Sequence, residues 1–126
     1  MQNQLKKLIK TSLFLLVLVL FTSCQNVEFD TEKIYGEWKV VDWEIVTTGE
    51  KRGNQMDMSF VKEDDYVVDY GSEKEEGKFW IRNQYLYTLE NGEAEKKVKL
   101  LDLKTDTLSF QMNRAGEIEN VLLVKK

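Results

Sequence analysis

The side chains that could perform catalysis occur in this sequence in patterns that do not support a reaction. Two pairs of neighbouring carboxylates, Asp64-Asp65 and Glu75-Glu76, have the residue type that glycoside hydrolysis requires. Neighbours on a strand point to opposite faces, and neighbours in a turn are solvated, so neither pair should face a common cleft. The chain has no histidine that would activate Ser109 or Thr107 as a nucleophile. We therefore predict that the protein is not an enzyme.

A second group of side chains, aromatic rings and thioethers, has the chemistry of a hydrophobic binding site. They recur at alternate positions along several segments, so that one face of each segment is apolar. Tyrosine hydroxyls would supply the few polar groups that orient a ligand, and flexible methionines would adapt to its shape. The candidate lining residues are Trp38, Met56, Met58, Phe60, Tyr66, Tyr70, Phe79, Tyr85, Tyr87, Phe110 and Met112.

The composition argues against several classes of function. The 126 residues suit one domain, and the single cysteine cannot form an internal disulfide. Without histidine, metal-ligand spacing or a phosphate-binding glycine loop, we predict neither a metal nor a cofactor. The formal net charge of −4 becomes −7 once the first 23 residues, with their three lysines and no acidic residue, are removed. A domain this acidic would repel a phosphate backbone, so we predict no nucleic-acid binding.

Residues 1–23 have the three-part layout of a secretory signal peptide. A positive stretch containing Lys6, Lys7 and Lys10 precedes an apolar run over 13–21, and small residues then precede Cys24. The apolar run is too short to cross a hydrocarbon core, which takes about 20 apolar residues. A cleaved signal peptide is therefore favoured over an uncleaved membrane anchor.

The segment Leu20-Phe21-Thr22-Ser23-Cys24 resembles the lipobox of bacterial lipoproteins, in which small residues precede an obligatory cysteine. That family prefers leucine three positions before the cysteine, where this sequence has Phe21. The resemblance implies lipidation of Cys24, cleavage before it and acylation of the new amino terminus, with chains such as palmitate. More than one acyl chain gives stable membrane attachment. We expect residues 24–33 to form the lipidated cysteine and a polar tether, in a cell-envelope protein at the outer membrane, on either its periplasmic or its surface side.

After the tether, alternating apolar and polar residues predict an all-β domain over 34–126. A single helical turn over 30–35, capped by Asp30 or Thr31, is the one short helical segment expected here. The first strand changes phase between Val40 and Val41, as at a β-bulge. The predicted strands lie near 38–45, 56–60, 66–70, 78–82, 85–89, 98–103, 108–112 and 118–124.

Short turns separate these strands, which predicts an antiparallel up-and-down meander. The charged runs 73–76 and 93–97 are expected at solvated hairpin ends. Trp43 and Trp80 fall out of phase with the inward residues of their strands, which makes them candidates for exposed aromatic side chains.

The segment Ile34-Tyr35-Gly36-Glu37-Trp38 contains a Gly-x-Trp motif that follows the helical turn and opens the meander. This resembles the lipocalin signature, and the domain resembles the small lipocalin-like domains of many Gram-negative lipoproteins. The resemblance implies a small closed barrel of about eight strands, in which Gly36 permits a sharp turn and Trp38 plugs the closed end. The family stacks an arginine near the end of its last strand on this tryptophan. Here Lys125 or Lys126 would take that place, with a weaker planar contact.

Two functions follow from this domain. The first is a membrane-anchored envelope lipoprotein whose lipocalin-like barrel binds a small hydrophobic ligand. The second is a non-catalytic module with a filled core that contacts another envelope protein, as an accessory or inhibitor subunit. An eight-stranded barrel is wide enough either to be filled by side chains or to hold one small ligand. A cavity lined by the tyrosines and methionines would favour the first function, whereas a dry core with an exposed aromatic patch would favour the second.

Overall fold

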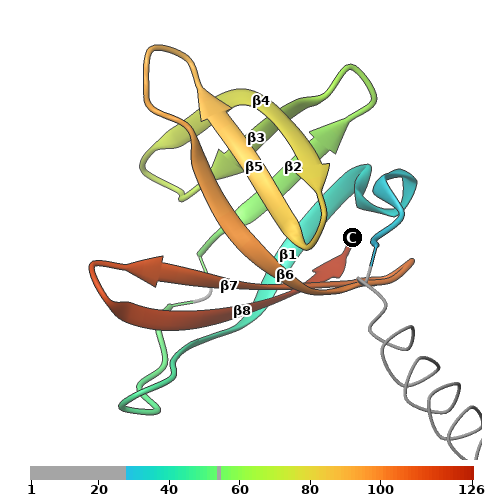
Figure 1. The fold of residues 1–126 in the computed structure, drawn as a ribbon. Helices are drawn as coiled ribbons and strands as arrows, with labels where there is room; N and C mark the ends of the chain where they lie inside the picture. The colour runs from blue at the N-terminus through green and yellow to red at the C-terminus, as the bar shows by residue number, and fades with distance from the viewer. Residues whose placement is uncertain (1–27, 54) are drawn as a thin grey trace, which may run out of the picture.

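The computed structural model describes residues 28–53 and 55–126, which form eight antiparallel strands closed into a barrel (Figure 1). Each strand pairs with the next one along the chain, and β8 pairs with β1, so that the ladder has no free edge. The predicted all-β class and up-and-down meander are confirmed. The strands are β1 (Gly36–Ile45), β2 (Asp57–Val61), β3 (Asp65–Asp69), β4 (Lys74–Arg82), β5 (Tyr85–Glu90), β6 (Lys96–Leu103), β7 (Thr107–Arg114) and β8 (Glu117–Lys125).

The predicted signal peptide, residues 1–23, and the predicted lipidation site, Cys24, lie outside the described residues. The first described element is the 3₁₀ helix η1 (Thr31–Ile34), which Asp30 caps by accepting a hydrogen bond from the Glu32 amide at 3.1 Å. Phe29 already packs against the core, so the folded domain begins before residue 34. Over the described ranges, the chain forms no helix with the length and apolar character needed to cross a membrane.

A β-bulge in β1 decides which of its side chains face the interior. The register with β8 shifts between Val40 and Asp42, which leaves Val41 as the extra, exposed residue. Alternation therefore reverses after this point, and Trp43 points inward with only 9% of its surface exposed. The phase change predicted here is confirmed, whereas the prediction of an exposed Trp43 is wrong.

Aromatic side chains fill the half of the barrel next to η1. Trp38 is fully buried, and its indole Nε1 donates a hydrogen bond of 2.7 Å to the Ile34 carbonyl, which ties the plug of the barrel to η1. Phe60 and Phe79 meet edge to face with their ring centroids 4.9 Å apart. The Lys125 ammonium lies 5.0 Å from the centroid of the Trp38 ring, which confirms the lysine contact expected at the end of the last strand.

Two glycines allow backbone geometry that other residues would resist. Gly36 turns the chain into β1 with a φ of +128°, as the Gly-x-Trp motif predicts. Gly77 lies in β4 where a Cβ atom would overlap the carbonyl oxygen of Leu89 in β5. β4 and β5 can therefore lie this close together only with glycine at position 77. Among the described residues, the eight strands and the core cluster lie within 29–125, so we expect the segment 28–126 to fold on its own.

Candidate ligand-binding site

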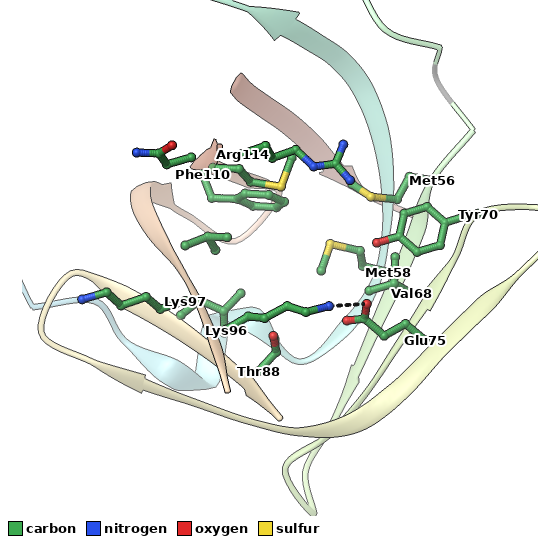
Figure 2. A pocket seen from close by; sticks show the side chains of 14 residues that line it. Met56, Met58, Val68, Tyr70, Glu75, Thr88, Lys96, Lys97, Phe110 and Arg114 are labelled. Atoms are coloured by element: carbon green, nitrogen blue, oxygen red, sulfur yellow. Dashed lines mark hydrogen bonds and ion pairs between the residues drawn. The ribbon is translucent and has the colours of Figure 1, made fainter. Parts of the chain in front are cut away.

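The half of the barrel farther from η1 contains a cavity of about 360 Å³ that reaches the surface (Figure 2). Its volume lies within the range of small-molecule sites, roughly 300–1,000 Å³. Methionine, aliphatic and aromatic side chains make up most of the wall, and charged and polar side chains make up the rest. The apolar lining consists of Met56, Met58, Val68, Tyr70, Leu86, Val98, Phe110 and Met112.

Strand alternation places these side chains together. Met58 of β2 and Val68 of β3 are direct cross-strand partners, and so are Leu86 of β5 and Val98 of β6. Partners in an antiparallel pair lie on the same face of the sheet, so each pair presents two apolar side chains to the cavity. The cavity is therefore formed by inward-facing apolar residues of at least four strands.

The mouth of the cavity carries both signs of charge. The Lys96 ammonium lies 3.4 Å from a carboxylate oxygen of Glu75 and 3.8 Å from one of Glu90, and Figure 2 shows the Lys96 and Glu75 side chains meeting. The second carboxylate oxygen of Glu75 accepts a hydrogen bond of 2.7 Å from the Tyr66 hydroxyl. Burial lowers the pKa of Lys96, but the attraction of both carboxylates outweighs burial and raises this pKa above its ordinary value. Lys96 is therefore a charged donor at neutral pH.

Tyr70 supplies a neutral hydroxyl at the same mouth. Partial burial raises the pKa of this hydroxyl, and the charge of Glu75 adds to the rise, while Lys96 and Arg114 oppose it. The hydroxyl therefore stays protonated at neutral pH and can donate or accept a hydrogen bond. Figure 2 shows the Tyr70 ring at the rim, facing the cavity beside Met56.

A buried carboxylate supports the rim near Arg114. Glu119 of β8 is fully buried, and one of its oxygens accepts a hydrogen bond of 3.1 Å from the Trp43 indole and pairs with Arg52. The other oxygen has no hydrogen-bond partner among the described residues, and the nearest cation, Arg114 Nε, lies 3.7 Å away. The loop between β1 and β2 is thus held to β8 through Arg52.

Most of the predicted lining residues are inside the barrel, but only some of them reach the cavity. The large aromatic side chains fill the end next to η1, and the methionines leave space at the other end. Five predicted residues line the cavity: Met56, Met58, Tyr70, Phe110 and Met112. Four others pack in the core: Trp38, Phe60, Tyr66 and Phe79.

The prediction that Tyr85 and Tyr87 face the interior is wrong. Tyr87 is the cross-strand partner of Trp80, and the next pair, Leu86 with Ile81, faces inward instead. The inward positions of β5 therefore belong to Leu86 and Thr88, and both tyrosines lie half-buried on the outer surface. A tyrosine ring can pack on neighbouring side chains while its hydroxyl contacts water, so tyrosine suits an outer position of the barrel as well as an inner one.

Sequence reasoning missed the charged residues at the mouth. In the run 73–76, only Glu73 precedes the strand. β4 begins at Lys74, and Glu75 points inward. The run 93–97 likewise extends into β6, where Lys96 reaches over the cavity. A signal was present: Glu75 precedes the inward Gly77 by two positions, Lys96 precedes Val98 by two, and Arg114 follows Met112 by two. Continuing the alternation to the strand ends would have placed all three at the mouth.

Comparison with solved structures supports the fold. The sequence matches no protein-family model and no curated protein. A lipocalin-like protein from Bacteroides uniformis ATCC 8492 superposes with a TM-score of 0.59 at 10% identity, over 75% of this chain and 99% of that one. An uncharacterized protein from Bacteroides eggerthii DSM 20697 also has a TM-score of 0.59, at 11% identity, over 74% of this chain and 99% of its own. At this identity the likeness shows a lipocalin-like fold.

Within residues 28–53 and 55–126, no three acidic or cysteine side chains come together as a set that could hold a metal ion. What the site offers is an apolar chamber with a hydroxyl, an ammonium, a guanidinium and a carboxylate at its mouth. Such an arrangement can enclose an apolar group and orient a polar one by hydrogen bonds.

Proposed function

We propose that the barrel binds one small, mainly hydrophobic molecule, and that the protein is lipid-anchored in the cell envelope, at the outer membrane. The observation that carries the binding proposal is the cavity of about 360 Å³ lined by Met56, Met58, Phe110 and Met112. The cavity opens to solvent at its mouth, and its mainly apolar lining inside the barrel supports a ligand site over a filled interior. The lipocalin-like fold supports the same function.

The polar mouth supports a ligand with one polar end. The apolar part would contact Met58 and Phe110 within the barrel, and the polar end would meet Tyr70, Lys96 and Arg114 at the rim. Burying a polar group without a partner is costly, and these three donors would supply partners where the ligand leaves the apolar chamber.

We further propose that the site is not catalytic. Glu75 is already engaged by Lys96 and by the Tyr66 hydroxyl. Its neighbour Glu76 is exposed on the opposite face of β4, so the two carboxylates cannot act on one substrate.

The binding proposal is tested with a fluorescent apolar probe, N-phenyl-1-naphthylamine, and the domain of residues 28–126. Met112→Trp should fill part of the cavity from its mouth and weaken probe binding about ten-fold, since loss of about 1.4 kcal/mol gives that factor. Leu101→Trp is the matched control, because Leu101 is 42% exposed and points away from the barrel interior. Equal affinity of both variants and the wild type would show that the probe does not enter the cavity, and the proposal would fail.

The anchor is tested separately in cells that express the whole chain. An alkyne analogue of palmitate should label the protein and bring it into the membrane fraction. Cys24→Ala should abolish both the label and the membrane fractionation. Unchanged labelling of the Cys24→Ala protein would refute lipidation at this residue.

A further inference from the structure

One face of the outer surface of the barrel combines aromatic and basic side chains, and one of its members, Lys97, also borders the cavity. This face lies on the outer surface of β4, β5 and β6, where alternation points every second residue away from the core. We call it the aromatic face. Its members are Trp80, Arg82, Tyr85, Tyr87, Lys97 and Lys99.

The three aromatic rings of this face form a continuous cluster. Trp80 and Tyr87 are cross-strand partners, their rings are parallel within 2°, and the ring centroids are 5.5 Å apart. Tyr85 extends the cluster: its ring centroid lies 6.4 Å from that of Tyr87, and the two ring planes are inclined by 57°. All three side chains are half-buried, so part of each one is available to a partner.

Cations surround these rings. The Lys97 ammonium lies 4.6 Å from the centroid of the Tyr85 ring, and the Arg82 guanidinium carbon lies 5.8 Å from that of Tyr87. Figure 2 shows Lys97 pointing away from the cavity, whereas Lys96 points across it. Among the described residues, Arg82, Lys97 and Lys99 have no carboxylate within ion-pairing distance. In a mature chain of net charge −7 this face therefore concentrates uncompensated positive charge.

The face adjoins the end of the barrel at which the chain enters. The Tyr35 ring, directly after η1, lies 6.1 Å from the ring of Phe79, the neighbour of Trp80 in β4. Figure 1 shows η1 and the turn between β4 and β5 on the same side of the barrel. Cys24 precedes the first described residue by four positions, which span about 14 Å at most. A lipid on Cys24 would thus keep this end of the barrel close to a membrane.

We propose that the aromatic face rests on an anionic phospholipid surface. Tryptophan and tyrosine favour the membrane interface, where an apolar ring and a polar tip are both satisfied. Lysine and arginine near such a surface gain about 1 kcal/mol each from its negative potential. The inference rests on the proposed lipid anchor only for bringing the face to the membrane. The rest of the cavity mouth, at Tyr70, Glu75 and Arg114, lies toward the other end of the barrel and stays open.

The experiment uses residues 28–126, which lack Cys24, so that failure of the face and failure of the anchor are separate results. Sedimentation with vesicles measures binding to phosphatidylcholine alone and to its mixture with phosphatidylglycerol. We expect binding to the anionic vesicles that weakens as salt is added. Lys97→Gln with Lys99→Gln should weaken it on the order of thirty-fold. The matched control replaces two exposed lysines elsewhere, Lys39 and Lys74, by glutamine and should retain most of the affinity.

Tryptophan fluorescence reports whether this face makes the contact. Of the three tryptophans, Trp38 and Trp43 are buried, so a blue shift and quenching by brominated lipid would come from Trp80 and vanish in Trp80→Phe. Equal affinity for both vesicle types, or equal losses in the two lysine pairs, would overturn the proposal. Retention on an acidic protein without any vesicle binding would also overturn it, because the partner would then be a protein rather than a membrane.

Discussion

Removing Arg52 while Glu119 stays in place should destabilise the barrel markedly. Glu119 is fully buried, and its charge is held by Arg52, by the Trp43 indole at 3.1 Å and by Arg114 at 3.7 Å. Breaking a buried ion pair by removing one partner costs about 3–5 kcal/mol, because the other charge stays buried without compensation. The Arg52 side chain is 42% exposed and two partners of Glu119 remain, so we expect Arg52→Met to cost about 2–3 kcal/mol.

Urea denaturation of residues 28–126, followed by tryptophan fluorescence, measures this free energy of unfolding. The double variant Arg52→Met with Glu119→Met should lose less stability than the two single variants together, since it removes both charges at once. The control is Lys51→Met in the same loop. Lys51 pairs with Asp42 at 2.9 Å, but both side chains are about half exposed, so loss of this pair should cost much less than loss of Arg52. A loss no larger for Arg52→Met than for Lys51→Met, or strict additivity in the cycle, would refute the reasoning.

Three further predictions concern the frame of the barrel. Gly77→Ala should lower the free energy of unfolding, measured in urea, by about 3 kcal/mol, because the new methyl group overlaps the β5 backbone. Gly53→Ala is the control: it has open space around it and should change this free energy by less than about 0.5 kcal/mol. Lys125→Met should lower the free energy of unfolding by about 0.5–1 kcal/mol through loss of the contact with Trp38, and Lys125→Arg should retain it. Burial and hydrogen bonding raise the pKa of Tyr66 in the folded state. The free energy of unfolding should therefore be unaffected by the ionisation of this group below about pH 10, where the tyrosine of the unfolded chain is protonated, and should decline as the pH rises further. In urea titrations from pH 8 upward, Tyr66→Phe should show a smaller decline than the wild type.

Local pattern was enough to predict the architecture. Period-two alternation and short turns predicted an antiparallel meander, and each observed strand overlaps a predicted one. The Gly-x-Trp motif indicated where the barrel begins, and the structure confirms the turn at Gly36 and the buried Trp38. These features depend on residues close together in the chain, which is why they can be predicted from the sequence.

The division between core and cavity could not be predicted in the same way. Phe60 and Met58 occupy equivalent inward positions of β2, yet Phe60 packs against Phe79 and Met58 lines open space. Whether an inward side chain packs or lines open space depends on which side chains of distant strands lie beside it. It also depends on the total volume of the side chains at that level of the barrel. The charged mouth was missed for a different reason: Glu75 and Lys96 lie in charged runs, whose composition is that of a solvated turn.

The two tryptophans that fall out of phase with their strands show why register matters for function. Trp43 and Trp80 have the same apparent pattern, with apolar inward residues on alternate positions around them. In β1 the extra residue Val41 reverses the alternation, so Trp43 turns inward and donates a hydrogen bond to Glu119. β4 has no register shift in its pairing with β5, so Trp80 stays outside and stacks on Tyr87. The extra residue Val41 thus turns Trp43 toward the cavity rim, whereas Trp80, in a strand without such a residue, is left for a surface contact. The place of Val41 in the ladder is fixed by the pairing of β1 with β8, the last strand of the domain.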